Sequence, residues 1–223
     1  MKLGIFGGSF DPIHTGHLCA ALRFKNLMKL DLILLLPAFE PFYKKTCHTA
    51  YGHRLAMCQL AVKNMDGIEV SDLEQNMPPK AFTCDVVREI AARHPGHELF
   101  LLLGSDAFAR MPRWKHVDEI IRTAVIVAFR RRQAKECSDA CRNAEQELRQ
   151  RGGDIRILDA PMLPISSSMI RAKAARCESI REFVCPSVVR HIERYGLYPE
   201  HPESAACELS AKTNIAPHSL DVP

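Results

Sequence analysis

Short apolar runs alternate with amphipathic stretches along most of the chain. The run at 31–37 contains Leu-Ile-Leu-Leu-Leu without interruption, which is typical of a parallel strand covered on both faces. The apolar runs predict strands at residues 3–7, 31–37, 68–73, 98–103, 124–129 and 155–158. The amphipathic stretches predict helices at residues 18–30, 51–63, 82–93, 114–121, 134–151, 166–175 and 186–195.

Strands that alternate with helices indicate βαβ units. They predict an α/β fold, a doubly wound parallel sheet with helices on both faces. In open sheets of this kind, ligands bind beyond the carboxyl ends of the strands, where the strand order reverses. The informative loops are therefore those that follow Phe6, Pro37, Leu103 and Leu158.

The chain has 223 residues, which is enough for one domain that folds without disulfides or a structural metal. We expect this single domain to span residues 1–198. Residues 199–223 have no apolar periodicity and carry several prolines among serine and alanine. They predict a loosely ordered C-terminal tail.

The composition excludes several classes of protein. Hydrophobic residues make up 47% and charged residues 25%, which argues against a disordered, collagen-like or membrane chain. The formal net charge of +4 suits small anionic ligands and is weak for a nucleic-acid binder. We therefore expect no nucleic acid and no membrane among the partners. The arginine run at 130–132 is interpreted as a solvated face.

Nine cysteines occur without any Cys-x-x-Cys pair, so a zinc site is not expected. Unpaired thiols fit a reducing compartment. The N-terminus leads directly into an apolar strand and shows no signal peptide. These features together predict a cytoplasmic protein.

The loop after the first strand, residues 7–17, reads Gly-Gly-Ser-Phe-Asp-Pro-Ile-His-Thr-Gly-His. Glycines there permit close approach of the backbone to a ligand, and N–H groups at a helix start can receive an anion. His14 and His17 lie three residues apart, so both imidazoles can donate charge-assisted hydrogen bonds to a phosphate. The spacing matches neither a P-loop nor a dinucleotide fingerprint. The alternative is a glycine turn followed by surface histidines.

A second motif, Ile-Ser-Ser-Ser-Met-Ile-Arg at 165–171, follows the last predicted strand and begins a helix. Its serines are N-cap candidates and leave hydroxyl and N–H groups for an anion. Arg171 lies one turn further on, where its guanidinium can bind phosphate oxygens. Taken alone, this motif is explained as well by an ordinary capped helix. Together with the first loop it favours a phosphate site.

The two motifs resemble those of the nucleotidyltransferase superfamily, which shares the His-x-Gly-His element with class I aminoacyl-tRNA synthetases. Over residues 1–198 the chain resembles the bacterial nicotinate-nucleotide adenylyltransferase family, which has a Rossmann-like fold. The resemblance implies catalytic roles at the ATP phosphates for His14, His17 and Arg171. It also implies an ATP site that includes Gly7, Gly8, Ser9, Phe10, Gly16, Ser166, Ser167 and Ile170.

The resemblance extends to three further loops. Gly104 and Asp106 follow a central strand near both nucleotides, although an aspartate there can equally serve as a helix N-cap. Trp114, the only tryptophan, is implied to stack on the nicotinate ring rather than to fill the core, and Thr83 to contact the ring substituent. Lys44 is implied to attract the triphosphate. Tyr43 and Phe82 replace residues that the family commonly carries there.

The reaction that the resemblance implies is transfer of the adenylyl group of ATP to nicotinate mononucleotide, giving deamido-NAD and pyrophosphate. Mg²⁺ is expected to accompany ATP with no dedicated protein metal site. The alternatives are nicotinamide mononucleotide or another phosphorylated acceptor, a CTP donor, or a nucleotide-binding regulator without catalysis. We expect a monomer or a homodimer.

Overall fold

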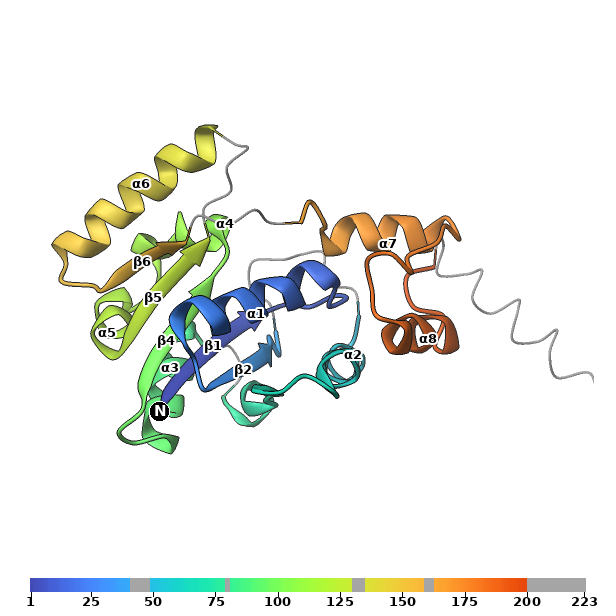
Figure 1. The fold of residues 1–223 in the computed structure, drawn as a ribbon, viewed down its shortest axis with the longest axis horizontal. Coiled ribbons are helices and arrows are strands. Elements are labelled where there is room, and N and C mark those ends of the chain that lie inside the picture. Colours follow the sequence, from blue (N-terminus) through green and yellow to red (C-terminus); the bar gives the residue numbers. More distant parts are fainter. Residues whose placement is uncertain (41–48, 79–80, 130–134, 159–162, 200–223) are drawn as a thin grey trace, which may run out of the picture.

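The computed structural model describes residues 1–40, 49–78, 81–129, 135–158 and 163–199 (Figure 1). The strands form a single parallel sheet in the order β3-β2-β1-β4-β5-β6. The order reverses between β1 and β4, where open sheets of this type bind their ligands. The strands are β1 (Lys2–Gly8), β2 (Leu32–Pro37), β3 (Ile68–Val70), β4 (Glu98–Leu103), β5 (Ala124–Phe129) and β6 (Ile155–Leu158).

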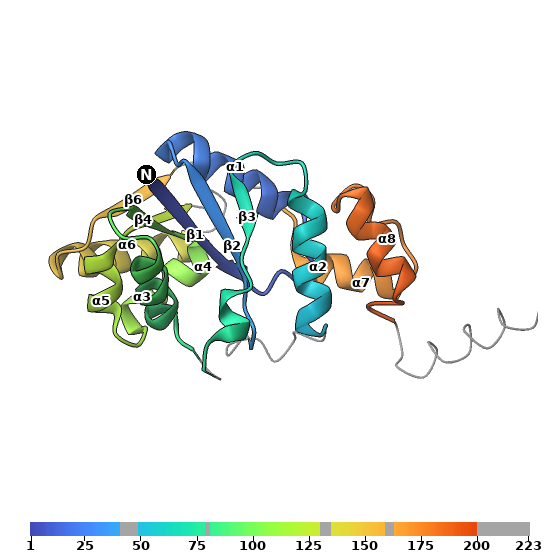
Figure 2. The same ribbon diagram turned by 90° about the horizontal axis from the view of Figure 1, so that it is seen from below.

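Helices cover both faces of the sheet, so the expected fold class is confirmed. Figure 2 shows α1 on one side of the strands and α3 and α5 on the other. The helices are α1 (Thr15–Met28), α2 (Tyr51–Val62), α3 (Thr83–Arg93), α4 (Ser105–Phe108), α5 (Val117–Thr123), α6 (Lys135–Gln150), α7 (Ser167–Ala175) and α8 (Pro186–Arg194), with 3-10 turns η1 (Leu73–Asn76) and η2 (Met111–Arg113).

Two hydrophobic cores, one on each face, explain the apolar runs. Along β4, Leu99, Leu101 and Leu103 pack on the face of α3, α5 and α6, whereas Phe100 and Leu102 pack on the face of α1 and α2. A strand buried on both faces must be apolar at every position. This requirement explains why strand positions were predictable from the sequence.

Helices α7 and α8 extend the first core beyond α2, at one end of the molecule (Figures 1 and 2). Ile170 of α7 and Val188 of α8 are fully buried in that core. The division into a domain at 1–198 and a tail stays a prediction, since residues 200–223 lie outside the described part of the chain. None of the helices in the described part is long and apolar enough to cross a bilayer.

Three boundaries differ from the sequence prediction by three residues, whereas the others agree within two residues. Helix α1 begins at Thr15, three residues earlier than expected. The strand expected at 68–73 ends at Val70, and Leu73 begins the η1 turn. The helix expected from residue 114 begins at Val117 because His116 before it has a left-handed φ of 52°. That turn leaves Trp114 in a loop.

Candidate active site

A cavity of about 850 Å³ lies at the carboxyl ends of β1 and β4, where the strand order reverses. This volume is within the range of small-molecule sites. The structure brings together fourteen of the residues that the sequence predicted for the site. They line the cavity from five segments of the chain: Gly7, Gly8, Ser9, Phe10, His14, Gly16, His17, Thr83, Gly104, Asp106, Trp114, Ser166, Ser167 and Arg171.

Two predicted site residues do not join this set. Ile170 is fully buried in the core beneath α7, and it does not line the cavity. Lys44, like Tyr43, lies outside the described residues, and so does the arginine run at 130–132.

The glycine loop is shaped by Phe10, which has a left-handed φ of 44° and is almost fully buried. A non-glycine residue in this region is held there by its surroundings. The ring of Phe10 packs against Gly8, where a Cβ atom would lie 2.9 Å from its Cζ atom. The second glycine of the loop therefore makes room for a buried aromatic ring.

His14 and His17 form the start of α1. The backbone N–H of His14 donates to Nδ1 of His17 at 3.3 Å, and the two rings stack with centroids 3.7 Å apart. Because Nδ1 of His17 accepts a hydrogen bond, the ring hydrogen of the neutral form is on Nε2. His17 can thus present an N–H donor to an anion in the cavity that it lines. The same contact explains the earlier start of α1.

Gly16 is the residue between the two histidines that permits this stacking. A Cβ atom on Gly16 would lie 3.0 Å from both Cε1 and Nδ1 of His14. His14 is only 5% exposed, so its ring has little room to move away. The glycine of the His-x-Gly-His motif is therefore explained by packing against the first histidine.

We expect Gly16→Ala to lower kcat by about 10- to 100-fold, since displacement of a catalytic group by a fraction of an ångström is costly. Stability should change by less than about 1 kcal/mol, because alanine also favours the helix. The matched control is Gly52→Ala in α2, where a Cβ atom meets nothing within 4 Å. That variant should keep full activity. Equal activity of the two variants would contradict the packing role of Gly16.

The second motif is bound directly to the first. Ser166 is the N-cap of α7 and accepts a hydrogen bond from the backbone N–H of Met169 at 3.2 Å. The Ser167 hydroxyl donates to the carbonyl of Pro12 at 3.0 Å. Nη1 of Arg171 donates to the carbonyl of Asp11 at 2.7 Å. The start of α7 and the loop after β1 therefore form one wall of the cavity.

A family model described as cytidylyltransferase-like matches residues 5–173. A curated relative from Gemmatimonas aurantiaca, called a probable nicotinate-nucleotide adenylyltransferase, is 34% identical over 92% of this chain and 96% of its own length. A relative of the same name from Clostridium tetani is 33% identical over 88% of this chain and 98% of its own length. The chain belongs to the nicotinate-nucleotide adenylyltransferase family. The resemblance noted in the sequence is confirmed.

A solved structure shares the fold of this family member. It is the nicotinic acid mononucleotide adenylyltransferase of Plasmodium falciparum complexed with NaAD, with a TM-score of 0.69 and 20% identity. The match covers 88% of this chain and 97% of that one. The two proteins therefore share the same arrangement of strands and helices.

Asp11 is a site residue of this adenylyltransferase that sequence reasoning missed. Its carboxylate is 1% exposed, accepts the Tyr198 hydroxyl at 2.7 Å and lies 4.0 Å from Nη1 of Arg171. Burial and the Asp11 charge raise the pKa of Tyr198, so the phenol stays protonated as a donor. Asp11 thus links the first loop to Arg171 and to the end of the described chain.

Arg54 of α2 was also missed. It is 2% exposed, and its guanidinium donates to the carbonyls of Ser9 at 2.9 Å, Phe39 at 3.2 Å and Thr49 at 3.1 Å. The Glu74 carboxylate accepts the N–H of Phe39 at 3.0 Å, and burial raises the pKa of Glu74. Arg54 therefore fixes the loops after β1 and β2 relative to each other. No sequence signal separates it from a solvated helix arginine.

The far end of the cavity lies at the start of α3 and before α5. Thr83 begins α3, and the Asp85 carboxylate accepts the N–H of Phe82 at 2.9 Å, a contact that lowers the pKa of Asp85. Trp114 is half-buried against the second core and also lines the cavity. It therefore contributes to the core and to the cavity wall, and its stacking on the nicotinate ring stays a prediction. Cationic residues that sequence reasoning did not select also line the cavity, namely Arg110, Arg113 and Lys115.

Gly104 and Asp106 lie in the short α4 after β4. Gly104 is the N-cap residue, and its carbonyl accepts the N–H of Phe108 at 3.0 Å. Asp106 is exposed in the first turn and lines the cavity. The cap is therefore formed by Gly104, and the Asp106 carboxylate is on the cavity wall as expected for a sugar contact.

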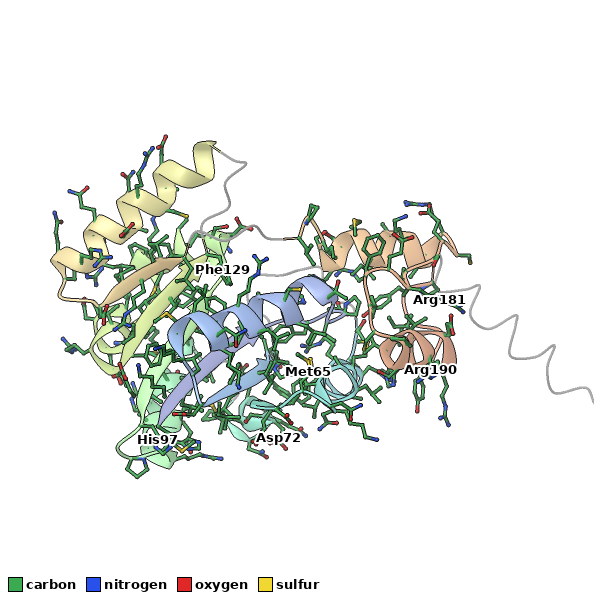
Figure 3. The ribbon with its side chains drawn as sticks, viewed as in Figure 1. Met65, Asp72, His97, Phe129, Arg181 and Arg190 are labelled. Carbon is green, nitrogen blue, oxygen red and sulfur yellow. The ribbon has the colours of Figure 1, made fainter. Side chains whose placement is uncertain are left out.

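A second His-x-Gly-His sequence, His-Pro-Gly-His, occurs at residues 94–97. It follows α3, its glycine has φ 77°, and its two rings meet edge to face 5.4 Å apart rather than stacking. Figure 3 shows His97 at the amino ends of the strands and Phe129, which lines the cavity, at the carboxyl end of β5. The four-residue motif alone therefore does not identify the active site. Only the copy that follows β1 lies at the cavity.

Proposed function

We propose that this chain transfers the adenylyl group of ATP to nicotinate mononucleotide, giving deamido-NAD and pyrophosphate. The observation that carries the proposal is the single wall formed by His14, His17 and the start of α7 in a cavity of about 850 Å³. The names of the relatives support the same activity.

In the reaction, an oxygen of the 5′-phosphate of the mononucleotide attacks the α-phosphorus of ATP. The bond from that phosphorus to the oxygen bridging to the β-phosphate breaks, and pyrophosphate leaves with the electron pair. The nucleophile is already an anion, so catalysis depends on positioning and on stabilising charge at the phosphate oxygens. His17 would supply an N–H donor, and Arg171 and the N-terminus of α7 would hold the leaving phosphates.

Mg²⁺ would neutralise charge on the triphosphate. The described residues contain no group of three or more His, Cys, Asp or Glu side chains that could hold a metal ion. Mg²⁺ keeps several of its waters and binds mainly to substrate oxygens, so the expected ion needs few protein ligands.

We place the reaction in the cytoplasm. Six cysteines in the described part of the chain are free thiols, among them the exposed Cys19 and Cys177. Thiols persist in a reducing compartment. A monomer or homodimer acting on small molecules, without nucleic acid, stays our expectation.

Pyrophosphate release with ATP and Mg²⁺ tests the activity, with nicotinate and nicotinamide mononucleotide measured in parallel. We expect rapid release with the nicotinate form and slow release with the nicotinamide form. Replacing ATP by CTP is the control for the donor. Measurable ATP binding without release in the presence of either mononucleotide would contradict the proposal and favour a regulator.

A further inference from the structure

We propose that Lys115 selects the acid form of the pyridine mononucleotide, by attracting the 3-carboxylate and repelling a ring that lacks it. The inference rests on the proposed function and assigns specificity to one ammonium group. Lys115 lines the cavity together with Trp114, Phe82 and Thr83, so the charge faces the end where the pyridine ring is expected.

The position of the ammonium group is fixed by an aromatic ring. Nζ of Lys115 lies 4.4 Å from the centroid of Phe82, within the range of a cation–π interaction. Phe82 immediately precedes Thr83, and its own backbone is held by Asp85. The exposed lysine side chain thereby lies beside the start of α3, at the edge of the cavity.

The neighbouring carboxylates are already occupied by another cation. Arg88 donates to Oδ1 of Asp85 at 3.0 Å and to both oxygens of Glu119 at 2.6 and 2.7 Å. The backbone N–H of Phe82, Arg88 and, to a smaller extent, Lys115 lower the pKa of Asp85, so the ammonium group lies near this carboxylate, although Lys115 forms no ion pair among the residues that the structure describes. The charge of Lys115 can therefore still bind a ligand that enters the cavity.

The two candidate mononucleotides differ in charge at the ring. The pyridinium nitrogen is positive in both, but the nicotinate ring also carries a carboxylate and is neutral as a whole. An ammonium group beside the ring therefore repels the nicotinamide form, whereas it forms a charge-assisted hydrogen bond with the nicotinate form. Attraction of one ligand and repulsion of the other both contribute to specificity.

Arg110 and Arg113 line the same cavity, but neither guanidinium is positioned over an aromatic ring of the described residues. Within the described ranges neither guanidinium forms a hydrogen bond, ion pair or cation–π contact, whereas the Lys115 ammonium lies over Phe82. Arginines in a site for two polyanions can serve phosphates, which are identical in both mononucleotides. Lys115 is therefore the residue that can distinguish the rings.

The test is equilibrium binding of nicotinate and nicotinamide mononucleotide, measured by fluorescence of the single tryptophan, Trp114, in the full-length protein. Lys115→Met is expected to weaken binding of the nicotinate form by about tenfold and to change that of the nicotinamide form little or improve it. Lys115→Arg should retain the preference. High salt should reduce the preference of the wild type but not that of Lys115→Met. Lys63→Met, an exposed lysine outside the cavity, is the matched control.

Three results would overturn the proposal. Lys115→Met could weaken both mononucleotides equally, which would assign Lys115 to the shared phosphate. The preference could survive in Lys115→Met, or shift with Arg113→Met instead. If the wild type neither binds nor turns over either mononucleotide, the proposed function itself is refuted. This outcome is distinguishable from the others because it is seen in the wild type, before any variant is measured.

Discussion

Replacing His17 by alanine is expected to lower kcat for adenylyl transfer by about 10²- to 10³-fold, the usual cost of losing one preorganised donor at a developing charge. The KM for ATP should change much less, because the donor matters most in the transition state. The hydrogen bond from the backbone N–H of His14 to Nδ1 of His17 sets the tautomer that makes Nε2 the donor. Steady-state pyrophosphate release measures both constants.

Two further variants separate this role from a structural one. His17→Gln retains an N–H donor near the position of Nε2 and should recover part of the rate. His97→Ala alters the last residue of the second His-x-Gly-His sequence, outside the cavity, and should keep full activity. Native activity in His17→Ala, or a comparable loss in His97→Ala, would refute the assignment.

Replacing Arg54 by methionine is expected to destabilise the fold by about 3–5 kcal/mol, because each carbonyl that loses its donor without gaining another costs about 1–3 kcal/mol. The variant leaves the carbonyls of Ser9, Phe39 and Thr49 without the guanidinium that they share. Because Ser9 belongs to the glycine loop, the KM for ATP should rise even where the protein remains folded. Urea unfolding gives the stability, and kinetics in the absence of urea give the KM.

Arg93→Met provides the comparison for Arg54→Met. Arg93 forms an exposed pair with Glu89 at 2.8 Å, one turn away on α3. Such pairs contribute about 1 kcal/mol or less. If Arg54→Met were no more destabilising than Arg93→Met, the three carbonyl contacts would not hold the loops together.

The sheet was predictable because strands buried on both faces must be apolar throughout, as the run at 98–103 illustrates. The boundaries that failed depend on backbone turns with no hydrophobic signature, such as the left-handed His116 that delays α5. Periodicity reports which residues face a core, and it does not report where a loop turns.

The residues of the candidate site also divide into those that the sequence predicted and those that only the structure revealed. His14, His17 and Arg171 were identified because they belong to motifs with fixed spacing. Arg54 and Asp11 were missed because their importance comes from burial and from partners distant in the sequence. Ile170 was assigned to the ATP site with its motif, yet its side chain supports α7 from the core. A motif therefore marks a segment, and only packing shows which of its side chains face the ligand.

The hydrogen bonds between the loop after β1 and α7 also determine the order in which the site can form during synthesis. Asp11 leaves the ribosome early, but its partners Arg171 and Tyr198 follow 160 and 187 residues later. The nascent chain can therefore assemble the central strands before the glycine loop has its final contacts. A ribosome-bound chain that ends before α7 would carry both histidines and still lack the wall that completes the phosphate site.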